Sequence, residues 1–232
     1  MQVRKHERAA SPDLTGQPVV IIADGELGDP AELRTYLRGN EFVIAVDGGV
    51  RHAEALGLTV DLLLGDFDSL PAAALARYRC RGTPILSFPV DKDYTDTHLA
   101  LNWAAARGAR EALLLGATGS RLDQTLAHLF ILPRLWEEEG LYSRAVTPTN
   151  EIFPVCAGRG TVTFHGPPGG KFSLLPASDL VRGVTLEGAR YPLQDRDLEL
   201  GTSLTISNEF TGSPVRLSLR AGRLLVVVVR RE

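Results

Sequence analysis

The sequence has few cysteines and no long hydrophobic run. Its 232 residues include two cysteines, Cys80 and Cys156, which lie far apart and outside any CxxC or Cys/His cluster. This spacing excludes a disulfide framework and a cysteine-based zinc site. The longest apolar run, LLVVVV at 224–229, is too short to span a bilayer and is rich in β-branched residues, so it predicts a buried strand. We expect reduced thiols, a location in the cytoplasm and no membrane partner.

Strong charge and two nucleotide-binding motifs are also missing. The formal net charge of −3 gives no electrostatic reason to expect nucleic acid or an anionic membrane as a partner. No GxxxxGK[ST] occurs, and GPPGGK at 166–171 lacks both its spacing and the following helix, which excludes a P-loop. No GxGxxG follows the first apolar run, so a nicotinamide dinucleotide is poorly supported.

Residues 17–146 alternate between apolar runs and amphipathic stretches. Residues 1–16 are basic and polar, lack the apolar run of a signal peptide, and are predicted to be a disordered tail. Strands that alternate with helices predict an α/β domain with a doubly wound, mostly parallel sheet. The expected strands are 19–25, 42–49, 61–69, 84–90 and 112–119, with a candidate sixth at 141–146; the expected helices are 30–39, 50–57, 71–78, 98–108 and 122–139.

After residue 146 the pattern changes to short strand-like runs punctuated by Gly, Pro and Thr. Residues 147–232 are therefore predicted to form a small all-β sandwich. The expected strands are 152–156, 161–166, 171–176, 180–186, 203–210, 215–220 and 223–229.

Aspartates follow the apolar runs of the first region, where an open parallel sheet binds its ligands. They are Asp24, Asp47, Asp66, Asp68, Asp91, Asp93, Asp96 and Asp123. In an extended segment Asp66 and Asp68 would point to one face. Two such charges about 4 Å apart repel by roughly 4 kcal/mol, which a bound cation relieves, and oxygen ligands suit magnesium.

Ordinary structural roles compete with these assignments. Asp68 or Ser69 is expected to cap the following helix, and Thr95 with Asp96 has the form of another helix cap. Asp24 fits turn chemistry better than a ligand role. The histidines within predicted helices have no metal-ligand spacing and receive no catalytic part.

Two glycine turns lead from predicted strands into helices. They are DGGV at 47–50 and GATGSRLD at 116–123, and backbone amides at such turns bind anions. Arg121 then stands where its guanidinium can neutralise a polyphosphate, although a solvated charge at a helix start is the equal alternative.

Together these motifs resemble the thiamine pyrophosphokinases over nearly the whole chain. DGG, GDFDS, DKDYTD, GATGSRLDQ and ISNEF occur in the order and context seen in that family. The resemblance implies an enzyme in which the hydroxyl of thiamine attacks the β-phosphorus of ATP, giving thiamine diphosphate and AMP. It also implies a homodimer with thiamine bound near the subunit interface. Residues 17–146 would then bind nucleotide and metal, and residues 147–232 thiamine and the second subunit.

The site residues are carried over by motif from this resemblance. Asp66, Asp68 and Asp96 would hold magnesium and, with Arg121, form the catalytic group. The nucleotide would meet Asp47, Gly48, Gly49, Asp93, Thr95, Gly116, Gly119 and Ser120. Asp123, Gln124, Ser207 and Asn208 would contact substrate, the last two in the thiamine pocket of the other subunit.

One position departs from the family pattern TDxxKAL. Here the segment reads TDTHLAL, so Leu99 stands at the lysine position, and Lys92 or Arg121 is a candidate replacement. A packing role for Leu99 is the alternative. Two other functions stay open: a pyrophosphokinase for another hydroxymethyl substrate such as a pterin, and an inactive thiamine- or nucleotide-binding regulator.

Overall fold

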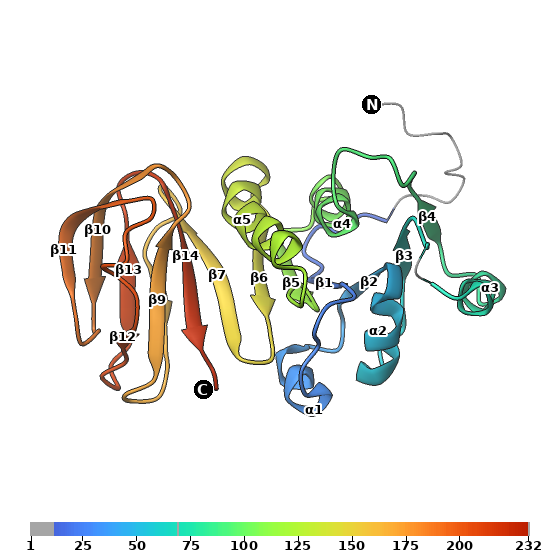
Figure 1. Cartoon of the computed structure of the whole chain (residues 1–232), viewed down its shortest axis with the longest axis horizontal. Coiled ribbons are helices and arrows are strands. Elements are labelled where there is room, and N and C mark those ends of the chain that lie inside the picture. The colour runs from blue at the N-terminus through green and yellow to red at the C-terminus, as the bar shows by residue number, and fades with distance from the viewer. Residues whose placement is uncertain (1–11, 69, 232) are drawn as a thin grey trace.

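One mixed sheet runs through the molecule (Figure 1). The structure is a computed structural model that describes residues 12–68 and 70–231. Six strands of this sheet are parallel, in the order β4-β3-β2-β1-β5-β6. Their bounds are β1 Val19–Ile22, β2 Phe42–Val46, β3 Leu62–Gly65, β4 Ile85–Ser87, β5 Glu111–Leu115 and β6 Tyr142–Val146.

Helices cover both faces of the parallel strands, because alternate strand residues point to opposite sides. Figure 1 shows α4 and α5 on one side and α1 and α2 on the other. Ile21, Ile44 and Leu64 pack in the core beneath α4 and α5, whereas Ile22 and Leu63 belong to the core with α1, α2 and α3. The helices are α1 Pro30–Leu33, α2 Val50–Leu56, α3 Ala72–Cys80, α4 Asp96–Ala105 and α5 Leu122–Glu139, with 3-10 turns at Arg34–Tyr36 and Asp47–Gly49.

The same sheet continues into an antiparallel half, in the order β6-β7-β14-β9-β12. A second, four-stranded sheet in the order β11-β10-β13-β8 packs on it around Phe153, Phe172 and Leu224. The strands are β7 Asn150–Cys156, β8 Val162–Phe164, β9 Lys171–Pro176, β10 Leu180–Glu187, β11 Leu193–Glu199, β12 Asn208–Glu209, β13 Val215–Ser218 and β14 Arg223–Val229. The predicted fold class, a doubly wound α/β region followed by a β sandwich, is therefore confirmed.

Several segments differ from the prediction, among them the helix expected at 30–39, which is α-helical only to Leu33 and continues as a 3-10 turn to Tyr36. The tail expected at 1–16 lies outside the described residues up to position 11, but Leu14 is fully buried and its N–H donates to Arg107 O at 2.8 Å, so residues from Leu14 onward belong to the fold. The strand expected at 203–210 is a turn that ends in the two-residue β12. β11 was not predicted, because most of its residues are exposed and show no apolar pattern.

The chain order places a topological switch point between β1 and β5. The chain starts at β1, adds β2, β3 and β4 on one side, and then returns to the other side of β1 with β5. The connections after β1 and β5 therefore diverge, and a crevice opens at the carboxyl ends of these two strands.

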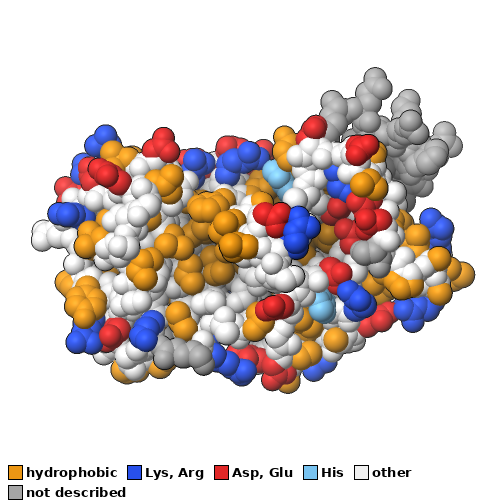
Figure 2. Space-filling view, in the orientation of Figure 1, with side chains coloured by type: hydrophobic (Ala, Val, Ile, Leu, Met, Phe, Trp, Pro, Cys, Tyr) orange, Lys and Arg blue, Asp and Glu red, His pale blue; other side chains and the backbone are white. Residues whose placement is uncertain are grey.

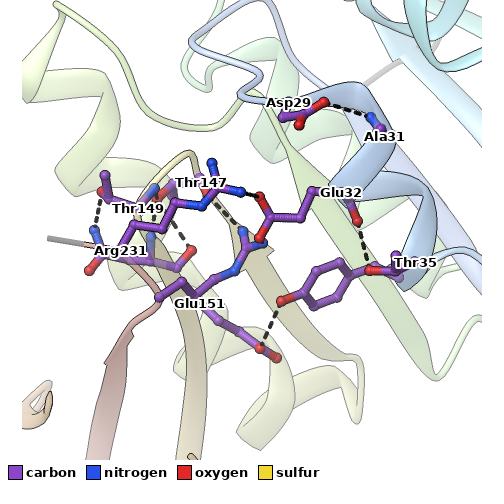
Figure 3. Close-up of polar contacts among 11 residues, drawn as sticks. Asp29, Ala31, Glu32, Thr35, Thr147, Thr149, Glu151 and Arg231 are labelled. Atoms are coloured by element: carbon purple, nitrogen blue, oxygen red, sulfur yellow. Dashed lines mark hydrogen bonds and ion pairs between the residues drawn. The ribbon is translucent and has the colours of Figure 1, made fainter. Parts of the chain in front are cut away.

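The C-terminal end of β14 is tied back to α1 (Figure 3). The guanidinium of Arg230 pairs with Glu32, lies 5.0 Å from the ring centre of Tyr36, and donates to Thr147 O at 3.0 Å. Arg231 contacts the other oxygen of Glu32 at 2.7 Å. These contacts join the last residues of the sandwich to the first helix of the α/β region.

No helix among the described residues combines the length and hydrophobicity needed to cross a bilayer.

Candidate active site

A cleft of about 600 Å³ lies at the switch point. Its walls come from the segments that follow β1, β2, β3 and β5 and from the loop before α4. Of the residues predicted to bind metal, nucleotide or substrate, it brings together Asp47, Asp66, Asp68, Asp93, Thr95, Asp96, Gly116, Gly119, Ser120, Arg121 and Gln124.

The turn at Gly25 and the turn at Gly116 meet backbone to backbone at the floor of the cleft. Gly25 N donates to Gly116 O at 2.9 Å, and Glu26 N donates to Thr118 O. A Cβ on Gly25 would lie 2.2 Å from Thr118 O, and one on Gly116 would lie 2.2 Å from Ala23 O. Gly116 also has a φ of +64°. Only glycine permits this close approach.

Two histidines from opposite faces of the sheet hold these turns. His52 Nε2 lies 2.7 Å from Gly25 O, and His128 Nδ1 lies 3.0 Å from Ala117 O. Burial lowers the pKa of His128, which favours the neutral form of its ring. The spacing of these histidines in the sequence indicates no catalytic part, and it contains no signal for the short distance between each helix and the turn of another segment.

Three carboxylates converge beside the turns. Ligand oxygens of Asp47, Asp66 and Asp96 all lie within 4.8 Å of one another. Asp96 Oδ1 is buried and has no hydrogen-bond partner. A buried acceptor without a partner is costly, so the cluster is suited to bind a cation.

The Lys92 ammonium lies between two of these carboxylates. Its Nζ is 2.8 Å from Asp66 Oδ2 and 2.7 Å from Asp96 Oδ2. Its hydrogen bond, more than any other contact, keeps the pKa of Asp66 below the ordinary value. Burial pulls the pKa of Lys92 down, but the two carboxylates outweigh it, and the net shift is upward.

The pKa of Asp47 is shifted upward, in the opposite direction to that of Asp66. Burial, and then the charges of Asp96 and Asp66, raise its pKa to about 6, although Phe67 N donates to its Oδ1 at 3.1 Å. From its motif, Asp47 is expected beside the nucleotide rather than in the metal group. Its position in the carboxylate cluster depends on the spacing of β2 and β3, which the motif itself does not encode.

Asp68 stands apart from the cluster although it lines the cleft. The expectation of an extended segment is wrong here, because Phe67 has a φ of +63° and Asp68 N turns back to Asp66 Oδ1 at 3.3 Å. Asp68 is exposed. It also does not cap α3, whose N-cap is Pro71 and makes no side-chain hydrogen bond; Ser69 lies outside the described residues.

The start of α4 combines a cap with the cluster. Thr95 Oγ1 accepts from His98 N at 3.2 Å, so the cap predicted for Thr95 is confirmed, while the carboxylate of Asp96 pairs with Lys92. Leu99 is buried in the core beneath α4, which confirms its packing role.

The remaining predicted residues of the first region sit at the rim or beneath the site. Arg121 forms two contacts with Asp123, at 3.0 and 2.7 Å, and both side chains are exposed. Gly48 and Gly49 are buried: a Cβ on Gly48 would strike the Asp24 carboxylate, and one on Gly49 would lie 2.0 Å from Ile22 O.

Ser207 and Asn208 lie far from the cleft within one chain. β12 is six strands away from β1 in the sheet order, which corresponds to roughly 29 Å at the usual strand spacing. The Asn208 side chain is buried and bonded to the backbone of Tyr191 in both directions, at 3.1 and 2.8 Å. Ser207 is exposed and has a φ of +58°.

Comparison with known proteins agrees with the arrangement of the two regions. Residues 33–141 match the family model "Thiamin pyrophosphokinase, catalytic domain", and residues 162–224 match "Thiamin pyrophosphokinase, vitamin B1 binding domain". The chain belongs to the thiamine pyrophosphokinase family. The resemblance inferred from the motifs, and the expectation of an enzyme of this kind, are thereby confirmed.

The relatives match this chain over almost their full length. The thiamine pyrophosphokinase of Bacillus subtilis (strain 168) is 28% identical over 210 residues, which are 89% of this chain and 96% of the relative. A crystal structure of the Bacillus subtilis enzyme has a TM-score of 0.82 at 26% identity and covers 93% of this chain and 100% of its own. A thiamin pyrophosphokinase structure from Geobacillus thermodenitrificans has a TM-score of 0.79 at 28% identity and covers 93% and 99%.

Proposed function

We propose that this protein transfers the pyrophosphoryl group of ATP to thiamine. The thiamine hydroxyl oxygen bonds to the β-phosphorus, the bond from that phosphorus to the oxygen bridging the α-phosphate breaks, and AMP leaves with the bridging oxygen. The hydroxyl proton is released. The observation that carries the proposal is the convergence of Asp47, Asp66 and Asp96 at the switch point of a chain in this family.

The donor set fits magnesium as the resident ion. Carboxylate oxygens are the ligands that Mg²⁺ prefers, and Asp96 Oδ1 is buried without a partner. Asp66 and Asp96 would hold the ion, with Asp47 and Asp68 as flanking carboxylates. When bound, the ion would neutralise charge on the polyphosphate.

The chain's own part in the reaction is positioning and charge neutralisation, which dominate phosphoryl-type transfer. The turn from Gly116 to Ser120 would bind phosphate through backbone amides at the start of α5. Arg121 would leave Asp123 for a phosphate oxygen, because its side chain is exposed at the rim. Asp93, Thr95 and Gln124 would line the path of the substrates. No residue is assigned as a general base.

We also propose a homodimer, as the resemblance implies. On α5 the apolar side chains Leu122, Leu126 and Phe130 recur every four residues and are 66%, 45% and 47% exposed. Figure 2 shows hydrophobic side chains gathered near the middle of one face of the molecule. Such a stripe is typical of a subunit contact. A second subunit would also bring its Ser207 to the cleft of the first, because Ser207 cannot reach the cleft of its own chain.

The reaction is tested with purified protein, ATP, Mg²⁺ and thiamine, with products resolved by mass-resolved chromatography. We expect AMP and thiamine diphosphate in equal amounts, and none from Asp66→Asn. Arg77→Met, which changes an exposed cation on α3, is the matched control and should keep wild-type turnover. Formation of ADP with thiamine monophosphate would move the attack to the terminal phosphorus. No thiamine product from folded, Mg²⁺-binding protein would refute the proposal.

The dimer is tested by light scattering and by complementation. Phe130→Asp should yield monomers, since it places a charge in the apolar stripe. Mixed refolding of inactive Asp66→Asn and Ser207→Trp chains should restore about a quarter of the wild-type activity, because half of the dimers then contain one intact site of two. Recovery of no activity would show that Asp66 and Ser207 do not contribute to one site from different chains.

A further inference from the structure

Lys92 already supplies a cation to the acidic cluster. Its ammonium contacts Asp66 Oδ2 and Asp96 Oδ2 at 2.8 and 2.7 Å, and all three side chains are only 12–13% exposed. The ammonium nevertheless leaves Asp96 Oδ1 buried and unpartnered. Lys92 therefore holds the two carboxylates together but does not satisfy the cluster.

We propose that the Lys92 ammonium and a divalent cation compete for Asp66 and Asp96, so that metal binding displaces Lys92 from both carboxylates. The inference rests on the magnesium site of the proposed function. Mg²⁺ binds oxygen at about 2.0–2.1 Å, so an ion shared by the two Oδ2 atoms needs the space that Nζ fills. A dication and an ammonium at that distance would also repel each other.

The position of Lys92 in the chain permits this exchange. It lies in the loop between β4 and α4 and lines the same cleft as the turn from Gly116 to Ser120. A lysine carries its charge on a flexible four-carbon stem, so the ammonium can move while the backbone stays in place. The displaced charge then remains in the cleft, where phosphate oxygens would bind it, whereas Leu99 is buried in the core and supplies none.

Before metal binds, Lys92 acts as a positioning residue. Without its charge, Asp47, Asp66 and Asp96 would face one another across at most 4.8 Å with no cation between them. The lysine thus keeps the carboxylates close enough to share an ion, at the cost of a lower affinity for that ion.

The test compares Mg²⁺ binding to the full chain without ATP or thiamine. Lys92→Met keeps most of the stem and removes the charge. The matched control Arg77→Met removes an exposed cation, 57% exposed and paired with Glu54, from α3. Affinity is measured by calorimetry, and the unfolding midpoint is measured in chelator and in Mg²⁺.

We expect Lys92→Met to bind Mg²⁺ at least about tenfold more tightly than the wild type, which corresponds to about 1.4 kcal/mol. Its midpoint in chelator should fall, and the rise on adding Mg²⁺ should exceed that of the wild type. Arg77→Met should change neither the affinity nor the rise. General damage to the fold would weaken binding, so tighter binding distinguishes competition from a structural role.

Equal or weaker Mg²⁺ binding by Lys92→Met would overturn the competition and leave the metal site intact. Absence of Mg²⁺ binding by both proteins would overturn the metal site and the competition together. If the Met variant does not fold, Lys92→Gln gives the same comparison, since its neutral amide still reaches toward the carboxylates.

Discussion

Replacement of Gly116 by alanine tests whether the contact between the turns at Gly25 and Gly116 forms the floor of the cleft. Gly116 has a φ of +64°, a conformation that costs a side-chain-bearing residue about 1–2 kcal/mol. Its added Cβ would lie 2.2 Å from Ala23 O, which is backbone and can retreat only if the turns separate. Separation would break the hydrogen bonds from Gly25 N to Gly116 O and from Glu26 N to Thr118 O.

The expected magnitude follows from these two contributions. Two hydrogen bonds at about 0.5–1.5 kcal/mol each add about 1–3 kcal/mol to the conformational strain. Gly116→Ala should therefore lower the free energy of unfolding by about 2–5 kcal/mol. Gly57→Ala is the matched control: Gly57 caps α2 with a φ of +73° and nothing within 4 Å of its added Cβ, so it should lose only the strain of about 1–2 kcal/mol.

Urea denaturation of the three proteins measures the difference, and thermal shift with Mg²⁺ and ATP measures the site. We expect Gly116→Ala, but not Gly57→Ala, to lose most of the shift produced by the nucleotide. Equal losses of stability in the two variants, within about 0.5 kcal/mol, would show that the turns tolerate separation and that the close approach does not shape the cleft.

Three further outcomes check other parts of the structure. Arg230→Ala should lower the free energy of unfolding, measured in urea, by about 1–3 kcal/mol, because the Arg230 side chain is only 10% exposed. Arg231→Ala should lower it by less than about 1 kcal/mol, because the Arg231 side chain is 58% exposed. Equal losses would contradict the contacts shown in Figure 3. A thiol reagent at pH 8 should label the exposed Cys80 of the folded wild-type protein and no other thiol, since burial raises the pKa of Cys156 to about 12. The control Cys80→Ser should not react, and labelling of two thiols in the folded wild type would contradict this. Burial, and then a nearby arginine, lower the pKa of His98 to about 4, so the unfolded chain binds the extra proton between pH 6.5 and 4. The contribution of neutral His98 to the free energy of unfolding is complete above pH 6.5 and is about 1 kcal/mol smaller at pH 5, after allowance for the partial exposure of the ring. His98→Gln should lack this loss when denaturation above pH 6.5 is compared with denaturation at pH 5.

Most strands could be predicted because burial on both faces leaves a mark in the sequence. Runs such as VVII and LLLG are apolar at every position, since helices cover both sides of the parallel sheet. β11 leaves no such mark: of LQDRDLE, only Leu198 is buried, and its pairing with β10 places it. The single sheet that joins the two predicted regions was not predicted, because the change of pattern at residue 146 indicated a domain boundary, whereas residues 147–149 form a short turn that pairs β6 with β7.

The candidate site was predicted in its residue types and less well in its grouping. Asp66 and Asp96 were assigned to one metal group from motifs alone, and the structure brings them together through Lys92. Asp68 was placed in that group by the same motif, and its pairing with Asp66 assumed an extended segment, which Phe67 breaks with its positive φ. Phe67 packs against the core beneath α2 and α3, and that tertiary contact is invisible in the spacing of two aspartates.

Gly65 explains why Asp47 replaces Asp68 as the third carboxylate. A Cβ on Gly65 would lie 1.7 Å from Asp47 Oδ1, so the missing side chain at the end of β3 is what admits that carboxylate from β2. Once there, Asp47 accepts from Phe67 N, and this bond accompanies the turn that directs Asp68 away. The motif GDFDS therefore acts through its glycine as much as through its aspartates: the first aspartate faces the cluster, the glycine makes room for a carboxylate from the neighbouring strand, and the second aspartate is left exposed at the lining of the cleft.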